Sequence, residues 1–408
     1  MTVRGAPAPS PARARGAVSL CFFVNGVVFA SWVPHIPDLK TRLGITDGGL
    51  GLVLLSTAVG AVLALPAAGW LIGRLGSRAV TSVSALGLSA AVVLPVMAPT
   101  LPLSVIALGI FGACTSLLDV SMNAQAVTVE ERYDRPIMSS FHALFSLGGL
   151  VGAAGAALAM LAGLEPTTHV VTIALLSLGA VAMAARDLDP ALSARQNAIP
   201  IFVRPPAVLL GLGLLTFAAL LAEGAMGDWS AVYLRDSVGS TAAVAAMGFA
   251  AFSLAMAIGR FCGDWLTRRI GPVSVVRISS GLAALGLTGA LVVAHPVAGV
   301  LGFGLMGFGI ANLIPVLFSA AGRTLGIAAG TALAAVATTG YCGYLAGPPL
   351  IGLAAELIGL RGALGIVSLA CGIVAVTATL VLRPRVTLPS PRDDNRAAAT
   401  HTTESSHA

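Results

Sequence analysis

The sequence is dominated by apolar runs of about 20 residues, the length at which an α-helix crosses the hydrocarbon core of a bilayer. Only 10% of the residues are charged, whereas soluble domains carry about 25%. We therefore expect an all-α, polytopic membrane protein with twelve transmembrane helices. The runs cover residues 17–37, 48–72, 79–98, 102–128, 137–161, 168–185, 207–231, 242–262, 272–294, 297–321, 328–355 and 361–382.

Basic residues indicate the orientation, because lysine and arginine are enriched in cytoplasmic loops. With both termini placed inside, 19 of the 23 basic residues lie on the cytoplasmic side, if Arg260 and Arg277 are counted with the adjoining inner loop. They are spread between apolar runs instead of clustering with aromatic residues, which argues against a nucleic-acid partner. The sequence thus predicts a multi-pass membrane protein with both termini in the cytoplasm and the lipid bilayer as its partner. The basic residues left outside are Lys40, Arg42, Arg235 and Arg361.

A polar, proline-containing stretch after the sixth run divides the chain into two halves. The first apolar run is long for a signal peptide and ends without a small-residue cleavage site, so we expect it to be retained as a helix. The expected parts are a cytoplasmic N-terminal segment (1–16), an N-terminal six-helix bundle (17–185), a cytoplasmic linker (186–206), a C-terminal six-helix bundle (207–382) and a disordered cytoplasmic tail (383–408).

Three motifs recur in the same order in both halves. "AAGWLIGRLGSR" (67–78) aligns with "AIGRFCGDWLTR" (257–268) at an offset of 190 residues. "GIFGAC" (109–114) is similar to "GLMGFG" (304–309), and "SFHALFSLGGLVG" (140–152) is similar to "GYCGYLAGPPLIG" (340–352). The shared order indicates a parallel duplication of a six-helix unit.

With these features the chain resembles transporters of the major facilitator superfamily (MFS) over residues 17–382. The family carries G-x-x-x-[DN]-[RK]-x-G-[RK]-[RK] between its second and third helices, where the motif is implicated in clamping the cytoplasmic side. The first copy here, "GWLIGRLGSR", has a glycine in place of the acid, and the second copy has its acid one position late. The resemblance implies a cytoplasmic gate motif made of Gly69, Gly73, Arg74, Gly76, Arg78, Gly259, Gly263, Asp264, Arg268 and Arg269.

Three further segments are similar to the MFS branch that includes the membrane protein MosC, namely "DVSMNAQAVTVE", "RPIMSSFHALFSLGGLVGA" and "EGAMGDWSAVYLRD". The resemblance implies two bundles that rock about a site near the bilayer midplane, which gives alternating access. The association of this branch with an inositol-derived compound implies a sugar- or cyclitol-like solute.

Ionisable groups at membrane depth are costly, so each one is a candidate functional residue. In the fourth run Ser116, Asp119 and Asn123 lie at i, i+3 and i+7 and therefore share one helical face. We expect this polar stripe to line a solute path, with hydrogen bonding to a neighbouring helix as the alternative.

The seventh run contains Glu223 and Asp228, which an ideal helix places about 7.5 Å apart along its axis and about 140° apart around it. Both would face one cavity only if Gly224 and Gly227 allow the helix to bend. Without a bend, Glu223 lies at mid-membrane and Asp228 nearer the outer gate. There we expect its aromatic neighbours, Trp229 and Tyr233, to act as interfacial anchors.

Other polar residues within the runs complete the candidate pathway. The first run has Asn25 and Gly26 followed by a tryptophan, and the seventh has Glu223 and a glycine followed by a tryptophan at a distance one residue shorter. This similarity predicts that Asn25 faces Glu223 across the pseudo-twofold axis. A lone histidine such as His142 is more often a packing residue than a functional one. The predicted substrate and proton pathway comprises Asn25, Asp119, Asn123, His142, Glu223, Asp228, Asn312, Tyr341 and Tyr344.

Several functions lack support in the sequence. All five cysteines lie in apolar runs without metal-ligand spacing, so we expect neither a disulfide framework nor a metal site. "GFGLMG" (302–307) fits a dinucleotide motif but lies in a membrane-length run, and it is better interpreted as close helix packing, as are "GWLIG" (69–73) and "GGLVG" (148–152). With no Walker motif or catalytic triad, we expect no enzymatic activity and no cofactor.

The sequence therefore predicts a monomeric secondary transporter for a small organic solute, with Asp119 or Glu223 carrying a coupled proton. The alternatives are a drug or metabolite efflux pump of the same fold and, with less support, a non-transporting membrane receptor.

Overall fold

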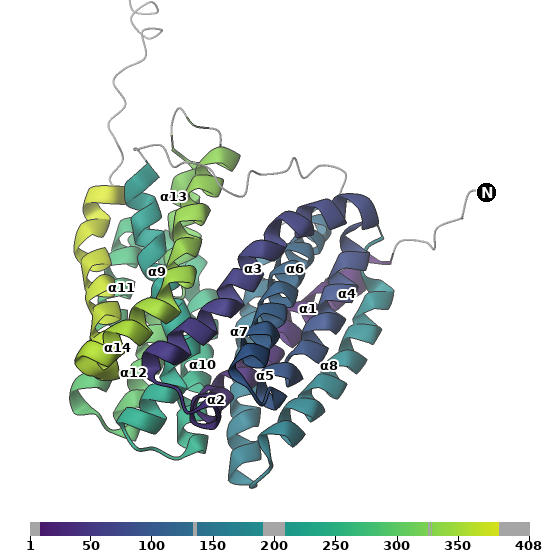
Figure 1. The fold of residues 1–408 in the computed structure, drawn as a ribbon. Helices are drawn as coiled ribbons and strands as arrows, with labels where there is room; N and C mark the ends of the chain where they lie inside the picture. Colours follow the sequence, from purple (N-terminus) through teal and green to yellow (C-terminus); the bar gives the residue numbers. More distant parts are fainter. Residues whose placement is uncertain (1–8, 134–136, 191–208, 325–326, 328, 383–408) are drawn as a thin grey trace, which may run out of the picture.

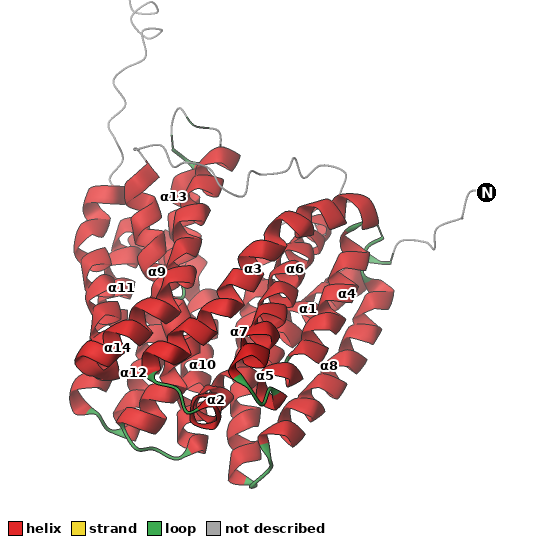
Figure 2. Cartoon of the chain, in the orientation of Figure 1, coloured by secondary structure: helices red, strands yellow, loops and turns green. Residues whose placement is uncertain are grey.

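The computed structural model describes residues 9–133, 137–190, 209–324, 327 and 329–382. Every regular element in these ranges is a helix (Figure 2). Most of the predicted linker and the whole predicted tail lie outside the described residues, so their properties remain predictions.

The helices follow the apolar runs in order. The first half contains α1 (Pro11–Trp32), a 3₁₀ turn (Val33–His35), α2 (Ile36–Leu43), α3 (Asp47–Leu75), α4 (Ser77–Ala91), α5 (Val93–Met97), α6 (Leu101–Tyr133), α7 (Met138–Leu161) and α8 (Pro166–Asp187). The second half contains α9 (Leu210–Val232), a π-helical turn (Tyr233–Ser237), α10 (Ala242–Ile270), α11 (Pro272–Val293), α12 (Pro296–Ile310), α13 (Leu313–Gly322) and α14 (Ala329–Leu382).

These helices confirm the expected twelve spans. Within the part of the chain that the structure describes, eleven stretches are long and apolar enough to cross a membrane, and the last of them covers residues 331–382. At 54 residues α14 would be about 80 Å long if straight, well over twice the hydrocarbon thickness. Gly359 interrupts it with φ 73°, a conformation that glycine adopts without strain, and so separates the eleventh span from the twelfth.

Several helices extend past the predicted spans. α10 continues to Ile270, whereas the apolar run ends at 262. Arg260 therefore lies ten residues before the end of its helix, about 15 Å along the axis. Counting Arg260 with the inner loop was wrong, and this residue belongs to the interior of the protein.

The helices form two bundles that converge at one end and diverge at the other (Figure 1). α1–α8 make up the first bundle and α9–α14 the second, and the two meet mainly through α7 with α10 and α3 with α14. We call the end that contains α2 and the π-helical turn the gate end. The opposite end, where α8 stops and α9 starts, is the linker end. Toward the linker end α3 and α13 are well separated in Figure 1.

The halves repeat each other, but with an offset of 195 residues. α3 (Asp47–Leu75) corresponds to α10 (Ala242–Ile270), and α8 (Pro166–Asp187) corresponds to residues 361–382 of α14. The alignment of 109–114 with 304–309 has this offset and is confirmed, whereas the alignments at 190 and 200 residues were wrong. Short glycine-rich motifs of the two halves can be aligned at several different offsets, whereas the ends of their helices agree at 195 residues.

Close glycine contacts have the same offset. A Cβ on Gly112 would overlap the carbonyl oxygen of Thr57, and one on Gly307 would overlap that of Phe252. The helix-packing interpretation of "GFGLMG" and "GGLVG" is therefore confirmed, since Gly148 is likewise in contact with the Phe23 carbonyl. The same interpretation of "GWLIG" was wrong, because a Cβ on Gly69 or Gly73 would meet no atom within 4 Å.

Candidate functional site

A charged pair lies at mid-depth where the two bundles meet. Arg260 of α10 donates to Glu223 Oε1 of α9 over 3.3 Å and to Ser146 Oγ of α7 over 2.7 Å. The Ser146 hydroxyl in turn donates to the carbonyl of His142. Arg260 and Glu223 are only 17% and 20% exposed, so solvent screens their attraction little. One guanidinium thus joins a carboxylate of its own bundle to a hydroxyl of the other.

Two tyrosines of α14 extend this pair toward the first bundle. Tyr341 is 47% exposed and lies close enough to both Asp119 and Glu223 to interact with them electrostatically. Tyr344 interacts in the same way with Glu223 and Arg260. We call the following residues the central cluster: Asp119, His142, Ser146, Glu223, Arg260, Tyr341 and Tyr344.

The predicted polar face of α6 is present. Asn123 donates to the carbonyl of Asp119 over 2.8 Å and to its Oδ1 over 3.3 Å. Among the described residues Asp119 has no cationic partner, in contrast to Glu223. The first bundle therefore presents an unpaired carboxylate opposite the ion pair of the second.

Helix α9 does not break between the two acids of the seventh span. It is α-helical from Leu210 to Val232, and neither Gly224 nor Gly227 has positive φ. A Cβ on Gly224 would lie 2.9 Å from the ring of Tyr344, and one on Gly227 would lie 3.5 Å from Phe29. Gly224 therefore allows the close approach of α14, Gly227 is in ordinary contact distance of α1, and neither glycine serves as a hinge.

The absence of a bend leaves the two acids in different surroundings. Glu223 pairs with Arg260, whereas Asp228, half-buried one and a half turns nearer the gate end, forms no hydrogen bond or ion pair with the described residues. The predicted interfacial role of its neighbours was wrong, because Trp229 and Tyr233 are fully buried. Tyr233 donates to the carbonyl of Ala290 and packs against Phe303 inside the second bundle.

Three other candidates lie within helix packing. Asn25 is 2% exposed and points its amide at the sulfur of Met122 within the first bundle, so it does not face Glu223 as expected. Its spacing to a tryptophan resembled that of the seventh span by coincidence. Asn312 lies between α12 and α13 and donates to the carbonyl of Gly259 over 2.9 Å. His142 packs edge-on against Phe22 and lies near Arg260.

The predicted cytoplasmic gate motif lies at the linker end. Arg78 donates to the carbonyls of Ala185 and Arg186 at the end of α8, and Arg74 lies over the ring of Trp70. With the 195-residue offset, Arg74 and Gly76 correspond to Arg269 and Gly271, and Gly69 corresponds to Asp264. The pairing of Gly69 with Gly259, Gly73 with Gly263 and Arg78 with Arg268 was therefore wrong.

The gate end is held by ion pairs between the bundles. Lys40 of α2 lies 2.7 Å from Asp236 of the π-helical turn, and Arg235 lies 3.0 Å from Asp38 of α2. π-helical turns are rare in proteins, and those that occur are often found at functional sites. This one presents two adjacent charged residues to the other bundle. We call these two ion pairs the outer latch.

Further contacts close the same end. Thr46 donates to Glu356 over 2.5 Å, and a Cβ on Gly352 would lie 2.6 Å from the carbonyl oxygen of Asp47. Closer to the central cluster, the Phe29 ring of the first bundle lies 6.4 Å from the Phe249 ring of the second. The structure is therefore closed from the gate end to about the level of the central cluster.

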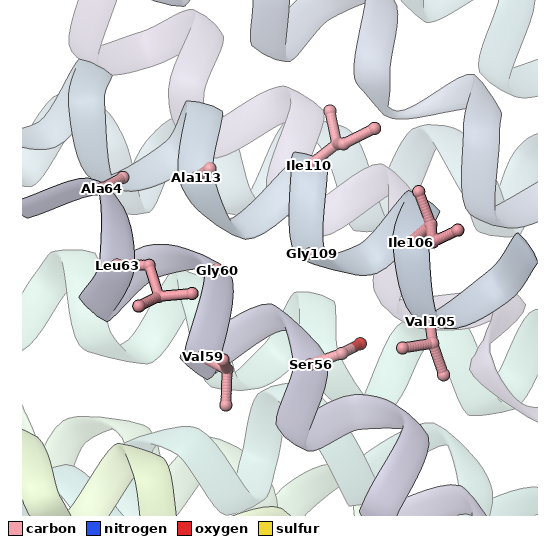
Figure 3. Close-up of a pocket in the computed structure, with 10 residues that line it drawn as sticks. All are labelled: Ser56, Val59, Gly60, Leu63, Ala64, Val105, Ile106, Gly109, Ile110 and Ala113. Atoms are coloured by element: carbon pink, nitrogen blue, oxygen red, sulfur yellow. The ribbon is translucent and has the colours of Figure 1, made fainter. Parts of the chain in front are cut away.

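A groove between α3 and α6 is lined by no residue of the central cluster (Figure 3). Aliphatic side chains such as Val59, Leu63 and Ile106 line it, and Leu63 is 73% exposed. Its one hydroxyl, that of Ser56, donates to the carbonyl of Val53 in its own helix. A surface of this kind fits lipid chains better than a polar solute.

Sequence reasoning missed Arg260, Ser146 and the outer latch. Arg260 interrupts the apolar stretch "AMAIGRFCG", and an ionisable residue in such a run is itself a signal. The latch had a weaker signal, because "PDLKTR" and "LRD" resemble ordinary loop charges until the fold brings them together.

The fold and the site define a polytopic membrane protein of the transporter class. A sequence profile described as Major Facilitator Superfamily matches residues 18–301 and 212–406. The chain belongs to the Major Facilitator Superfamily, as the resemblance in its sequence implied.

Individual relatives agree with this assignment. The chain is 39% identical to an uncharacterized MFS-type transporter of Yersinia pestis, over 89% of this chain and 94% of that protein. It is 35% identical to the membrane protein MosC of Rhizobium meliloti, over 92% of each chain. The crystal structure of the nucleoside transporter NupG shares the fold, with a TM-score of 0.70 over 91% of this chain and all of that one, at 13% identity.

Proposed function

We propose that the protein is a secondary active transporter that moves a small organic solute across the bacterial inner membrane by alternating access, coupled to protons. The observation that carries the proposal is the bridge made by Arg260 between Glu223 of its own bundle and Ser146 of the other. A charged group that joins both bundles at mid-depth is suited to link the occupancy of a site to their relative movement.

Glu223 is the proposed proton carrier. While it is ionised it holds one side of the Arg260 guanidinium. A proton on Glu223 removes that attraction and leaves Arg260 bonded to the first bundle through Ser146 alone. Asp119, which has an asparagine but no cation beside it, is the second candidate. In this scheme the charge state of the cluster differs between the loaded and empty transporter.

The chemistry of the cluster favours a neutral polyhydroxylated solute. The carboxylates and the Tyr341 hydroxyl of the cluster, together with the Asn123 amide beside Asp119, supply acceptors and donors for hydroxyl groups. Because Glu223 neutralises Arg260, no free cation remains in the cluster to attract an anion. This agrees with the sugar- or cyclitol-like solute that the resemblance to the MosC branch implies.

The linker end is the proposed cytoplasmic side. The predicted inside loops carry most of the arginines, and the helix ends that flank them lie at the linker end. With this orientation the structure is closed to the outside and both termini are cytoplasmic. We also propose that the protein acts as a monomer, because each chain contains both bundles.

The test has two stages. Purified protein is first screened by thermal shift against myo-inositol, glucose, uridine, amino acids and cationic drugs. A solute that stabilises it is then added to proteoliposomes loaded with a pH-sensitive dye. We expect the solute to drive proton movement in the wild type, and we expect Glu223→Gln, Asp119→Asn or both to abolish it while solute exchange persists.

Glu131→Gln is the matched control, because it makes the same chemical change at an exposed position at the end of α6. If Glu223→Gln and Asp119→Asn both keep wild-type proton movement, the coupling proposal fails. Downhill flux without any proton movement would identify a facilitator, and binding without flux would favour a receptor.

A further inference from the structure

The outer latch is connected to two buried histidines of the first bundle. His35, in the 3₁₀ turn after α1, and His169, in the first turns of α8, are 3% and 6% exposed. His35 Nε2 lies 3.0 Å from His169 Nδ1, so one proton lies between the two rings. Neither histidine belongs to the central cluster.

The pair is in direct contact with a latch residue. His35 Nδ1 lies 3.5 Å from Asp38 Oδ2, while the other oxygen of the same carboxylate, Oδ1, accepts from Arg235 of the second bundle. The two oxygens of Asp38 are thus divided between a histidine of its own bundle and an arginine of the other. Any positive charge gained by His35 must compete with Arg235 for this carboxylate.

The position of the available protons supports this competition. The neutral pair carries two ring protons, one between the rings and one on an outer nitrogen, and the outer nitrogens, His35 Nδ1 and His169 Nε2, have no hydrogen-bond partner within normal distance. A third proton gives the pair one positive charge and places an N–H on both outer nitrogens, so that the Nδ1–H of His35 points at Asp38. A buried charge requires a partner, and Asp38 is the carboxylate next to His35.

Other charged groups around the pair leave Asp38 as its main partner. Arg42 lies near enough to Asp38 to interact with it electrostatically, but its hydrogen bonds go to the carbonyls of Val96 and Pro95 on α5. A pocket beside the pair at the gate end is lined by His35 and by the charged residues Asp38, Arg42 and Glu165. The charged residues that line this pocket or pair with Asp38 are Asp38 itself, Arg42, Glu165 and, across the bundles, Arg235.

We propose that the His35–His169 pair is a proton-binding site at the gate end, and that its protonation releases Asp38 from Arg235 and opens the outer latch. The proposal deepens the proposed function, on which it rests for the placing of the gate end outside. An acidic exterior then favours the conformation open to that side, as a transporter that takes up protons with its solute requires.

The test measures the latch directly, without solute or gradient. Spin labels are placed at Leu101 and Ile358, exposed gate-end positions on different bundles, after Cys114, Cys262 and Cys342 have been replaced by alanine. Distances are recorded in lipid nanodiscs at about pH 7.5 and about pH 5.5, which bracket the usual range of histidine titration. We expect acidification to raise the ratio of long to short distances about fivefold, the effect of losing one partly exposed ion pair.

The variants separate the pair from other titrating groups. His35→Gln and His169→Gln should each abolish the response to pH. Asp38→Asn should give a high open fraction at both pH values. His295→Gln, an exposed histidine at the same end, is the control and should respond like the wild type.

Two results would overturn the proposal: no change of the wild-type distances with pH, or a response of normal size in both His35→Gln and His169→Gln. The outcome is independent of the proteoliposome test. A protein that fails to couple protons to solute still reports whether the histidine pair controls the latch.

Discussion

Neutralising Lys40 should open the gate end more than neutralising Asp236, although the two residues form one ion pair with each other. Lys40 Nζ lies 2.7 Å from Asp236 of the second bundle and 2.7 Å from Asp47 of its own. The lysine therefore neutralises two carboxylates at once, and only one of them moves away when the bundles separate. The two neutralising variants remove different numbers of interactions.

The expected magnitudes follow from exposure and charge. Lys40 and Asp236 are 18% and 35% exposed, so after solvent screening their pair is worth about 0.5–1 kcal/mol. Asp236→Asn removes this pair but leaves Lys40 with Asp47, which shifts the closed-to-open ratio about two- to fivefold toward open. Lys40→Met also leaves Asp47 and Asp236 without their shared cation. Each of these carboxylates lies 2.7 Å from the lysine nitrogen, so they are at most about 5 Å apart, which adds close to 1 kcal/mol of repulsion in the closed state. The total is about 1–2 kcal/mol, or about 5- to 30-fold.

The assay is the distance measurement between labels at Leu101 and Ile358, made at about pH 7.5 where histidine is mostly neutral. The double variant Lys40→Met/Asp236→Asn should return to the level of Asp236→Asn, because the repulsion needs both carboxylates. Glu131→Gln serves as the control for a neutralised acid at the opposite end. The reasoning is refuted if Lys40→Met opens the gate no more than Asp236→Asn, or if the double variant is as open as Lys40→Met.

Two other predictions concern packing and salt. Gly307→Ala should lower the thermal unfolding midpoint of the purified protein, since its Cβ would overlap the Phe252 carbonyl and force α10 and α12 apart at a cost of about 1–3 kcal/mol. Gly155→Ala, where a Cβ meets no atom within 4 Å, should leave the midpoint unchanged or raise it, and an equal fall in both would contradict the contact argument. Raising NaCl from about 0.05 M to about 0.5 M should increase the open fraction of the wild type, because the latch residues are partly exposed and their attraction is screened. The increase should be smaller in Lys40→Met/Arg235→Gln, and an equal increase there would place the salt effect outside the latch.

Local spacing predicted those parts of the site that lie on one helix. Asp119 and Asn123 are one turn apart on α6, and their side chains meet as the helical period requires. The same period separated Glu223 from Asp228, and a straight α9 keeps them apart. Internal comparison of the halves was less reliable, because a sequence rich in glycine and alanine aligns with itself at several offsets. Asn25 was assigned to the wrong partner for this reason.

The sequence by itself determined the number of spans, the division into halves and the family, because each depends on hydropathy or short motifs that a single segment carries. Only the tertiary structure decided which charges meet. Arg260 and Glu223 are 37 residues apart, and Lys40 and Asp236 are 196 apart, so no local pattern specifies either pair. Their meeting depends on how the bundles pack, and at the gate end on the relative position of two separately formed bundles. The physical reason is that hydrophobic spacing places a side chain on a helix, whereas ion pairing at an interface requires both helices to be in place.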